Sequence, residues 1–256
     1  MASTESPHSP IGAGAAGGSN VDKRRVRMVF TTRKGGESQA PYDSFNLANH
    51  VGDDSLAVAH NRERLERVLG LQKNQWMEQL HTNTVTVVTA PSESPVEATD
   101  ALVTTLPGLA LGVLVADCVP VLLADTSTGV CAAVHAGRIG ARNGIVPRTV
   151  KAMVELGAQP NKIQALLGPA ASGKNYEVPD AMAMDVERHL PGSRTKTANG
   201  TVGLDIRAGL VRQLMALGVT AIEADPRCTI DDEEFFSYRR EGTTGRQAGV
   251  IWLTGQ

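Results

Sequence analysis

Three residues of this sequence carry side chains that together suit a transition metal. His81 stands in the segment QLHT, Cys118 in ADCVP and His135 in VHAG. Two neutral imidazoles and one thiolate are ligands that favour Zn²⁺ or copper. Three protein ligands leave the fourth tetrahedral position open for water or substrate, as in catalytic zinc sites. The set therefore predicts a metal centre with one open coordination position.

The three residues lie far apart in the chain and match no local metal-binding motif, so only tertiary structure can bring them together. Two other interpretations stay open at this point. Cys118 can be a buried thiol beside two unrelated, hydrogen-bonded histidines. Alternatively, Cys118 and His135 can form a nucleophile and its base.

The remaining histidines and cysteines have less distinctive surroundings. His60 and His189 fall inside expected helices among charged neighbours, which is typical of a solvated helix face. Cys131 lies in the apolar run VCAAV and is expected in the core. A purely structural zinc site needs a fourth ligand, which would have to be His50 or Cys228.

Composition excludes several classes of protein. The 256 residues include 25 Lys and Arg against 27 Asp and Glu, which gives a net charge of −2 and no basic field for nucleic acid. Three cysteines without a C-x-x-C pair make no disulfide framework and fit a reducing compartment. No run approaches the roughly 18 apolar residues of a membrane span. We therefore expect a soluble, cytoplasmic protein.

Elements that position these side chains can be read from the apolar pattern. Residues 1–22 are rich in Ser, Gly, Ala and Pro and are expected to be a disordered tail, and residues 23–256 a single catalytic domain. Strands are predicted over residues 25–32, 76–81, 85–89, 111–116, 119–124, 130–135, 163–167, 219–223 and 249–253. Helices are predicted over residues 148–156, 181–189 and 205–217, and from a cap at Asp53 or Asp54 to a stop at Gly70, with Leu56, Leu65, Val68 and Leu69 as its apolar positions. Without a regular βαβ repeat, the mixture predicts an α+β or α/β sandwich.

A Gly-rich segment, GPAASGKN at residues 168–175, is similar to a phosphate-binding P-loop. Asn175 stands where that motif needs a hydroxyl for magnesium. Pro179 also prevents a helix from opening at Lys174, as the motif requires. We therefore expect a turn after a strand and not an NTPase.

The chain resembles the YfiH/YlmD-like proteins, long labelled polyphenol oxidases or laccases and now regarded as purine nucleoside phosphorylases. The resemblance runs over residues 26–253 and rests on segments in the family's order. They are TTRKGG (31–36), NL (46–47) with HVGDD (50–54), QLH (79–81), ADCVP (116–120), VHAG (134–137), GP (168–169) with YEV (176–178), DIR (205–207), CT (228–229), FFSYRR (235–240) and TGR (244–246).

This resemblance implies a four-layer α/β/β/α sandwich with mixed sheets. It implies that His81, Cys118 and His135 bind the metal, usually zinc, and that the substrates are purine nucleosides and phosphate. The implied activity is phosphorolysis of adenosine, inosine and methylthioadenosine, with adenosine deamination as a side activity. The family's His-Gly is here His81-Thr82, its Trp-Arg after His-Ala-Gly is Arg138-Ile139, and its Cys-Cys before Tyr is Lys174-Asn175.

Phosphorolysis requires groups that hold a phosphate dianion, and arginine does so with two parallel hydrogen bonds. Family motif and loop position give the candidates Arg33, Arg138, Arg207 and Arg239, of which Arg239 is expected to be catalytic together with Cys118 and His135. Asn46 is expected to contact substrate or to hold a turn. Asp117 is expected to orient a ligand imidazole or to cap the turn before Cys118.

Two rival functions remain open. A copper-dependent polyphenol oxidase is one, because copper competes with zinc at many nitrogen and sulfur sites, although one His-Cys-His site lacks the histidines of a multicopper relay. A structural zinc protein is the other. The zinc deaminases' H-x-E and P-C-x-x-C pattern is absent. The sequence leaves open the preferred nucleoside, the metal's role and the oligomeric state.

Overall fold

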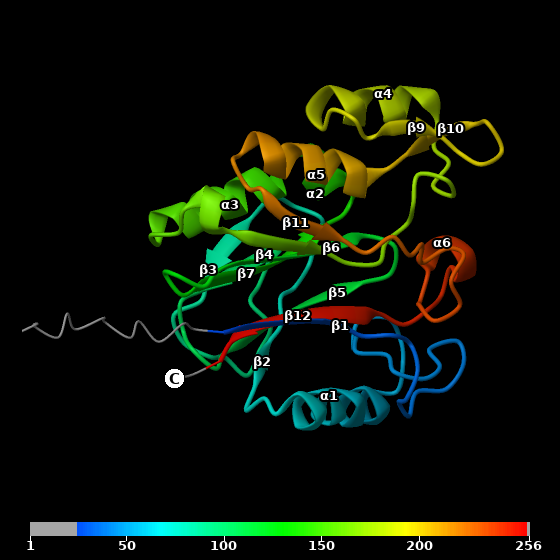
Figure 1. Cartoon of the computed structure of the whole chain (residues 1–256). Helices are drawn as coiled ribbons and strands as arrows, with labels where there is room; N and C mark the ends of the chain where they lie inside the picture. The colour runs from blue at the N-terminus through cyan, green and yellow to red at the C-terminus, as the bar shows by residue number, and fades with distance from the viewer. Residues whose placement is uncertain (1–24, 255–256) are drawn as a thin grey trace, which may run out of the picture.

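Four layers make up the computed structural model, which describes residues 25–254. Two sheets lie face to face, helices α2 to α5 cover the outer side of one sheet, and α1 covers the outer side of the other (Figure 1). Both sheets contain parallel and antiparallel pairs. The expected α/β/β/α sandwich with mixed sheets is thus confirmed, whereas the expected disordered tail lies outside the described residues.

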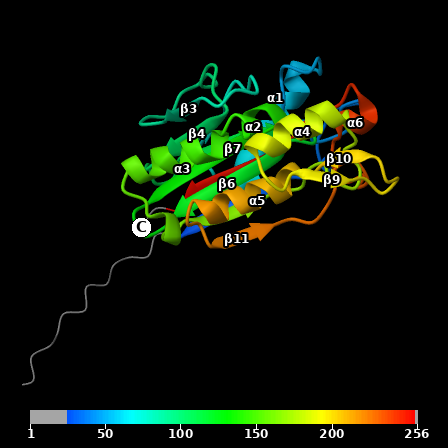
Figure 2. The same cartoon turned by 90° about the horizontal axis from the view of Figure 1, so that it is seen from above.

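The six-stranded sheet has the order β11-β8-β6-β7-β4-β3. Its strands are β3 Val85–Val87, β4 Ala101–Thr104, β6 Val119–Asp125, β7 Val130–Ala136, β8 Gln164–Leu167 and β11 Ala221–Ala224. The helices on it are α2 Arg138–Arg142, α3 Ile145–Glu155, α4 Asp180–His189 and α5 Ile206–Ala216, with the small hairpin β9 Arg194–Lys196 and β10 Val202–Leu204 beside α4 (Figure 2).

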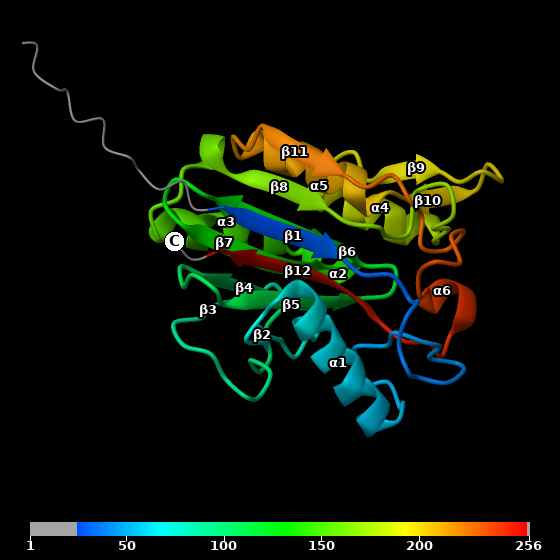
Figure 3. The same ribbon diagram turned by 60° about the horizontal axis from the view of Figure 1, so that its bottom comes forward.

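The four-stranded sheet has the order β1-β12-β5-β2. Its strands are β1 Val26–Phe30, β2 Asn74–Gln75, β5 Ala110–Val115 and β12 Gln247–Leu253, and α1 Ser55–Leu69 lies across it (Figure 3). β12 pairs antiparallel with both β1 and β5. The last strand of the chain therefore lies between an early strand and a middle one.

Alternation along the strands decides which core each side chain enters. In β6, Val121 and Leu123 face the helices, while Leu122 and Ala124 pack between the two sheets. Because both faces are covered, every residue of β5, β6 and β7 is buried. Cys131 belongs to the core between the sheets, as predicted.

The chain crosses from one sheet to the other at residues 116–118. β5 ends at Val115 in the four-stranded sheet, and β6 begins at Val119 in the six-stranded sheet. Asp117 has a φ of 86°, in the left-handed region that non-glycine residues rarely adopt. The crossing therefore places Cys118 at the end of the sandwich where both sheets meet.

Helix α1 begins and ends where its sequence signals predict. The Asp54 carboxylate accepts from the backbone N–H of Leu56, and Gly70 ends the helix with a φ of 67°. The prediction for its apolar face was partly wrong, because Leu56 and Val68 are 68% and 71% exposed. Asn61 takes a buried position there, since its amide bonds to Ser38 and to the backbone of residues 44 and 46.

Other differences concern short elements. The strand expected over residues 76–81 is replaced by β2 and a single bridge at Met77, so His81 does not end a strand. The sequence did not indicate β4, α2, the β9–β10 hairpin or α6 Tyr238–Glu241. No helix opens at Lys174, and α4 begins only after Pro179, which agrees with the rejection of a P-loop.

Within residues 25–254, none of the helices combines the length and apolar character needed to span a lipid bilayer.

Candidate functional site

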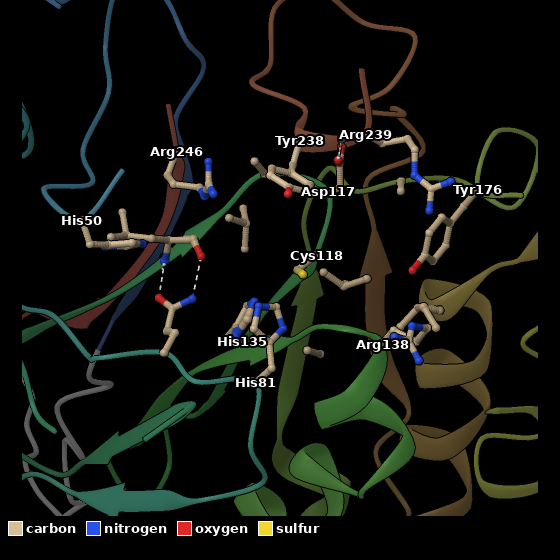
Figure 4. Close-up of a pocket in the computed structure, with 18 residues that line it drawn as sticks. His50, His81, Asp117, Cys118, His135, Arg138, Tyr176, Tyr238, Arg239 and Arg246 are labelled. Atoms are coloured by element: carbon tan, nitrogen blue, oxygen red, sulfur yellow. Dashed lines mark hydrogen bonds between the residues drawn. The ribbon is translucent and has the colours of Figure 1, made fainter. Parts of the chain in front are cut away.

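The three predicted ligands come together at the end of the sandwich. One ligand atom each from His81, Cys118 and His135 lies within 4.8 Å of the others (Figure 4). The two imidazole rings meet edge to face with centroids 4.7 Å apart. Zinc bonds of about 2.0–2.3 Å need only small inward movements from this arrangement. The donor set therefore fits the metal centre that the residue types predict.

A carboxylate that the sequence reading missed holds this cluster in place. Asp100 Oδ1 lies 2.8 Å from Nδ1 of His135 and accepts from the backbone N–H of His81 at 3.0 Å. Its Oδ2 accepts from the hydroxyl and the backbone N–H of Thr82, each at 2.7 Å. Because Nδ1 of His135 is engaged, Nε2 is the nitrogen left for a metal. Asp100, rather than Asp117, thus orients the imidazole of His135, and Thr82 joins the same network.

Backbone conformation also shapes the cluster. His81 has a φ of 58°, in the left-handed region that non-glycine residues rarely adopt, and its ring lies close to Cys118 and His135. Gly137 follows β7, and a Cβ placed on it would lie 2.7 Å from Nδ1 of His81 and 3.0 Å from Sγ of Cys118. Only glycine therefore leaves room for the ligand atoms to approach one another here.

Electrostatics separate the two imidazoles. Burial lowers the pKa of His81, and the neighbouring His135 lowers it further. Burial also lowers the pKa of His135, but Cys118 and Asp100 raise it more, to about 9. The pKa of Asp100 falls to about 2, because hydrogen bonds from His135 and Thr82 outweigh the effect of its burial. Asp100 therefore stays ionised at neutral pH and holds a permanent negative charge behind His135.

No fourth protein ligand joins the three among residues 25–254. Cys228 is buried, and its Sγ accepts from the backbone N–H of Ser172. His50 lines the same cavity but is not part of the cluster. An ion held by His81, Cys118 and His135 would keep an open position toward the cavity, which is typical of catalytic rather than structural sites.

The cavity above the ligands has a volume of about 510 Å³ and is rich in arginine. Arg138, Arg239 and Arg246 line it. None of the three forms an ion pair with a carboxylate in the described part of the chain. Arg33, Arg142 and Arg227, by contrast, each pair with an acidic side chain. Three arginines against the single carboxylate of Asp117 give the cavity lining a net positive charge, which suits a negatively charged ligand.

Two of the four candidate phosphate arginines lie elsewhere. Arg33 has a side chain only 14% exposed, paired with Asp43 and Glu241 and packed over the Phe236 ring. Arg207 is buried and donates to the backbone carbonyls of residues 168, 226 and 227. Neither residue lines the cavity. The guanidinium group of Arg33 is bound by carboxylates, and that of Arg207 by backbone carbonyls of two loops.

Asn46 and Asp117 position other residues of the site. Asn46 is fully buried, and its Oδ1 accepts from the backbone N–H of Arg246 at 2.9 Å. Asp117 accepts from Thr229 Oγ1 at 2.6 Å and from the backbone N–H of Arg239 at 2.7 Å. Asp117 thereby ties the strand crossing that carries Cys118 to the start of α6.

Several cavity residues were not singled out from the sequence. Arg246, Tyr176 and Tyr238 lie in segments that carry the family resemblance, but each is an ordinary surface residue type on its own. Arg239 packs over the Tyr176 ring at 4.8 Å and donates to the carbonyl of Glu177 at 3.1 Å. The feature of the sequence that could have identified Arg246, Tyr176 and Tyr238 is that all three lie in segments shared with the family.

Comparison with known proteins agrees with the residue pattern. A family model described as multi-copper polyphenol oxidoreductase laccase matches residues 27–254. A Corynebacterium glutamicum protein named purine nucleoside phosphorylase is 68% identical over 234 residues, which are 90% of this chain and 95% of the relative. A Mycobacterium tuberculosis protein of strain H37Rv with the same name is 55% identical over 231 residues, covering 90% and 92%. The solved structure of YlmD from Geobacillus stearothermophilus matches with a TM-score of 0.84 at 32% identity, covering 90% of this chain and 92% of that one.

Proposed function

The chain belongs to the family described as multi-copper polyphenol oxidoreductase laccase, which includes YlmD and relatives named purine nucleoside phosphorylase, and from this we propose that it is a zinc-dependent purine nucleoside phosphorylase. The proposed substrates are adenosine, inosine and methylthioadenosine together with phosphate. Adenosine deamination is the proposed side activity, and the cytoplasm the proposed location.

One observation supports this proposal above the others. An open three-ligand metal cluster lies at the floor of a cavity whose three arginines have no acidic partner. A cavity of about 510 Å³ falls in the range of small-molecule sites. A metal and a set of unpaired guanidinium groups suit a reaction that brings a phosphate dianion to a neutral nucleoside.

Phosphorolysis joins a phosphate oxygen to the anomeric carbon of the ribose as the glycosidic C–N bond breaks. The purine leaves with the electron pair of that bond and takes up a proton, and the products are ribose 1-phosphate and the free base. A bound Zn²⁺ supplies Lewis-acid stabilisation of negative charge. His81, Cys118 and His135 would hold it, with Asp100 fixing the His135 ring.

The chain's other groups bind and orient the reactants. Arg239 is held over Tyr176 and by the Glu177 carbonyl, so its guanidinium loses little freedom when it binds an oxyanion. Arg138 and Arg246 add positive charge to the same cavity. Cys118, His135 and Arg239 are therefore the proposed catalytic residues, and Arg138 a proposed substrate contact. Asn46 and Asp117 are proposed to position Arg246 and Arg239, whose backbone N–H groups donate to them.

The description of the family model favours a second candidate, oxidation of phenols with copper. Residues 25–254 contain a single group of side chains that meets the geometry for metal binding, whereas a multicopper relay needs several. The cationic lining also has no task in binding a neutral phenol. Both points favour phosphorolysis.

The test is chromatographic measurement of products from adenosine and inosine, with and without phosphate, on protein of measured metal content. Phosphate-dependent formation of ribose 1-phosphate by the zinc-loaded protein is expected. Its absence would sink the proposal. Phenol oxidation that rises with copper content, without phosphorolysis, would establish the second candidate.

A variant pair separates the metal role of Cys118 from a nucleophilic one. Cys118→Ala should lose zinc and turnover together, whereas Cys131→Ala, which removes a thiol in the core between the sheets, should keep both. Retention of zinc with loss of turnover in Cys118→Ala would point to a cysteine nucleophile instead.

A further inference from the structure

The arginines of the cavity lie at two opposite ends, with the metal ligands between them. Figure 4 shows Arg246 beside His50 at one end and Arg138 near Tyr176 and Arg239 at the other, with His81, Cys118 and His135 between the two groups. A substrate pair that fills the cavity must therefore place a different part at each end.

At the first end, there is one guanidinium group, and one of its nitrogens is already bonded. Arg246 Nη1 donates to the carbonyls of Thr244 and Gly245. Burial lowers the pKa of His50, and the charge of Arg246 lowers it further, which favours the neutral imidazole. The Tyr238 ring lies 6.0 Å from the Arg246 guanidinium. Rings and one partly used guanidinium suit a flat, uncharged heterocycle better than a dianion.

At the second end, there are two guanidinium groups, and most of their donors are unused. The side chain of Arg138 has neither a hydrogen bond nor an ion pair with any described residue. Arg239 uses one nitrogen on the Glu177 carbonyl and leaves the rest of its donors available. The hydroxyl end of Tyr176 points into the cavity beside Arg138 (Figure 4). Two guanidinium groups and a phenol therefore line this end of the cavity, and the neighbouring Asp117 carboxylate is already bonded to Thr229 and to the backbone N–H of Arg239. These donors suit a phosphate dianion.

The position of Arg138 follows from the local fold. Gly137 leaves the ligand atoms room and starts α2, and Arg138 is the first residue of that helix. The side chain of Arg138 lines the cavity, whereas that of the next residue, Ile139, is 43% exposed. An arginine placed one position later would leave the cavity.

We propose that Arg138, Arg239 and Tyr176 form the subsite for the phosphate co-substrate, and that Arg246, His50 and Tyr238 form the subsite for the purine base. This inference rests on the proposed phosphorolysis and deepens it. Phosphate and base then lie on opposite sides of the ribose, as displacement at the anomeric carbon requires.

Two measurements test the assignment. Binding of inorganic phosphate to the zinc-loaded protein is measured by titration calorimetry, and KM values for phosphate and for inosine are measured separately. Arg138→Gln and Arg239→Gln should each weaken phosphate binding about 10- to 100-fold and raise the phosphate KM to match, with little change in the inosine KM. Arg138→Lys, which keeps the charge but not the fork, should recover part of the loss.

Arg246→Gln should show the opposite split, with a higher inosine KM and an unchanged phosphate affinity. Arg64→Gln, which removes an exposed guanidinium on α1, is the charge control and should change neither value. A normal phosphate affinity in Arg138→Gln, or a loss of phosphate binding in Arg246→Gln alone, would overturn the assignment.

The calorimetric measurement of phosphate binding tests the phosphate subsite separately from the proposed phosphorolysis. If the native protein binds phosphate through Arg138 but forms no ribose 1-phosphate, the subsite stands and the proposed function fails. If it turns over inosine with a phosphate KM that ignores Arg138 and Arg239, the function stands and the subsite is wrong.

Discussion

Asp100 and His135 are joined by a 2.8 Å contact between Oδ1 and Nδ1, and both side chains are almost completely buried. The same oxygen accepts from the backbone of His81. One carboxylate thus sets the position of two of the three residues that would hold the metal. Removing its charge should therefore affect metal binding more than it affects the fold.

Asp100→Asn should weaken zinc binding about 10- to 100-fold, because an amide supports the imidazole less well than a carboxylate does. Competition with a coloured zinc chelator measures the affinity. Asp125→Asn is the matched control, since Asp125 is also fully buried but holds a turn at the opposite end of β6. Equal zinc affinities in the two variants would show that Asp100 has no special role at the site.

Asp125 also provides a prediction about pH. Burial raises the pKa of Asp125, but hydrogen bonds from Ser127, Gln159 and Thr128 lower it more, so its pKa lies below the ordinary 3.8. A carboxyl whose pKa is depressed in the folded state stabilises the protein above the unfolded pKa and loses that effect as the pH falls. The native protein should therefore lose stability below about pH 4 more steeply than Asp125→Asn. Urea unfolding at pH values from about 5 to about 2.5 measures the slopes, and parallel slopes would contradict the prediction.

Gly137→Ala should abolish metal binding while the protein stays folded. The added methyl would lie 2.7 Å from Nδ1 of His81, which is closer than a Cβ approaches other atoms, and 3.0 Å from Sγ of Cys118, which is a tight contact. The absorption spectrum of the cobalt-substituted protein reports the ligand geometry, and circular dichroism reports the fold. A normal tetrahedral cobalt spectrum would show that the ligands do not need this space.

Asp117→Asn should raise the phosphate KM about tenfold and leave the zinc content unchanged. The amide can replace only part of a carboxylate that accepts from both Thr229 and the backbone of Arg239, and charge-assisted bonds contribute about 1.5–3 kcal/mol. Thr229→Val should reproduce part of the effect, and Thr229→Ser, which keeps the hydroxyl, should not. Loss of zinc in Asp117→Asn would mean that Asp117 supports the ligands directly.

Strong local signals made part of the fold predictable. Asp54 and Gly70 are the two ends of α1, and the apolar runs before and after Cys118 became β5 and β6. β4 was missed because its four residues, buried on both faces, carry no alternation. α2 was missed because a five-residue helix containing glycine has almost no periodicity to detect.

At the site, the type of a residue could suggest its role, but the sequence could not show which residues lie beside one another. His81, Cys118 and His135 could be proposed because their side chains are typical metal ligands and because each stands in a segment that carries the family resemblance. Asp100 could not, because it acts on His135 across 35 residues of sequence and looks like any aspartate before a strand. Arg33 and Arg207 resembled binding residues, but their partners are carboxylates and carbonyls that only the tertiary structure brings near.

The place of β12 has a consequence for how the protein is made. This strand is the only link between β1 and β5 in the four-stranded sheet, and it is synthesised after both of them. While Gln247–Leu253 is still inside the ribosome, β1 has no partner among the described strands. The four-stranded sheet then lacks the strand that lies between β1 and β5. The four-stranded sheet therefore stays incomplete until the chain has been synthesised as far as Leu253 and that segment is free to pair. Unpaired strand edges promote wrong pairing and aggregation, so β1 is exposed to both until β12 lies beside it.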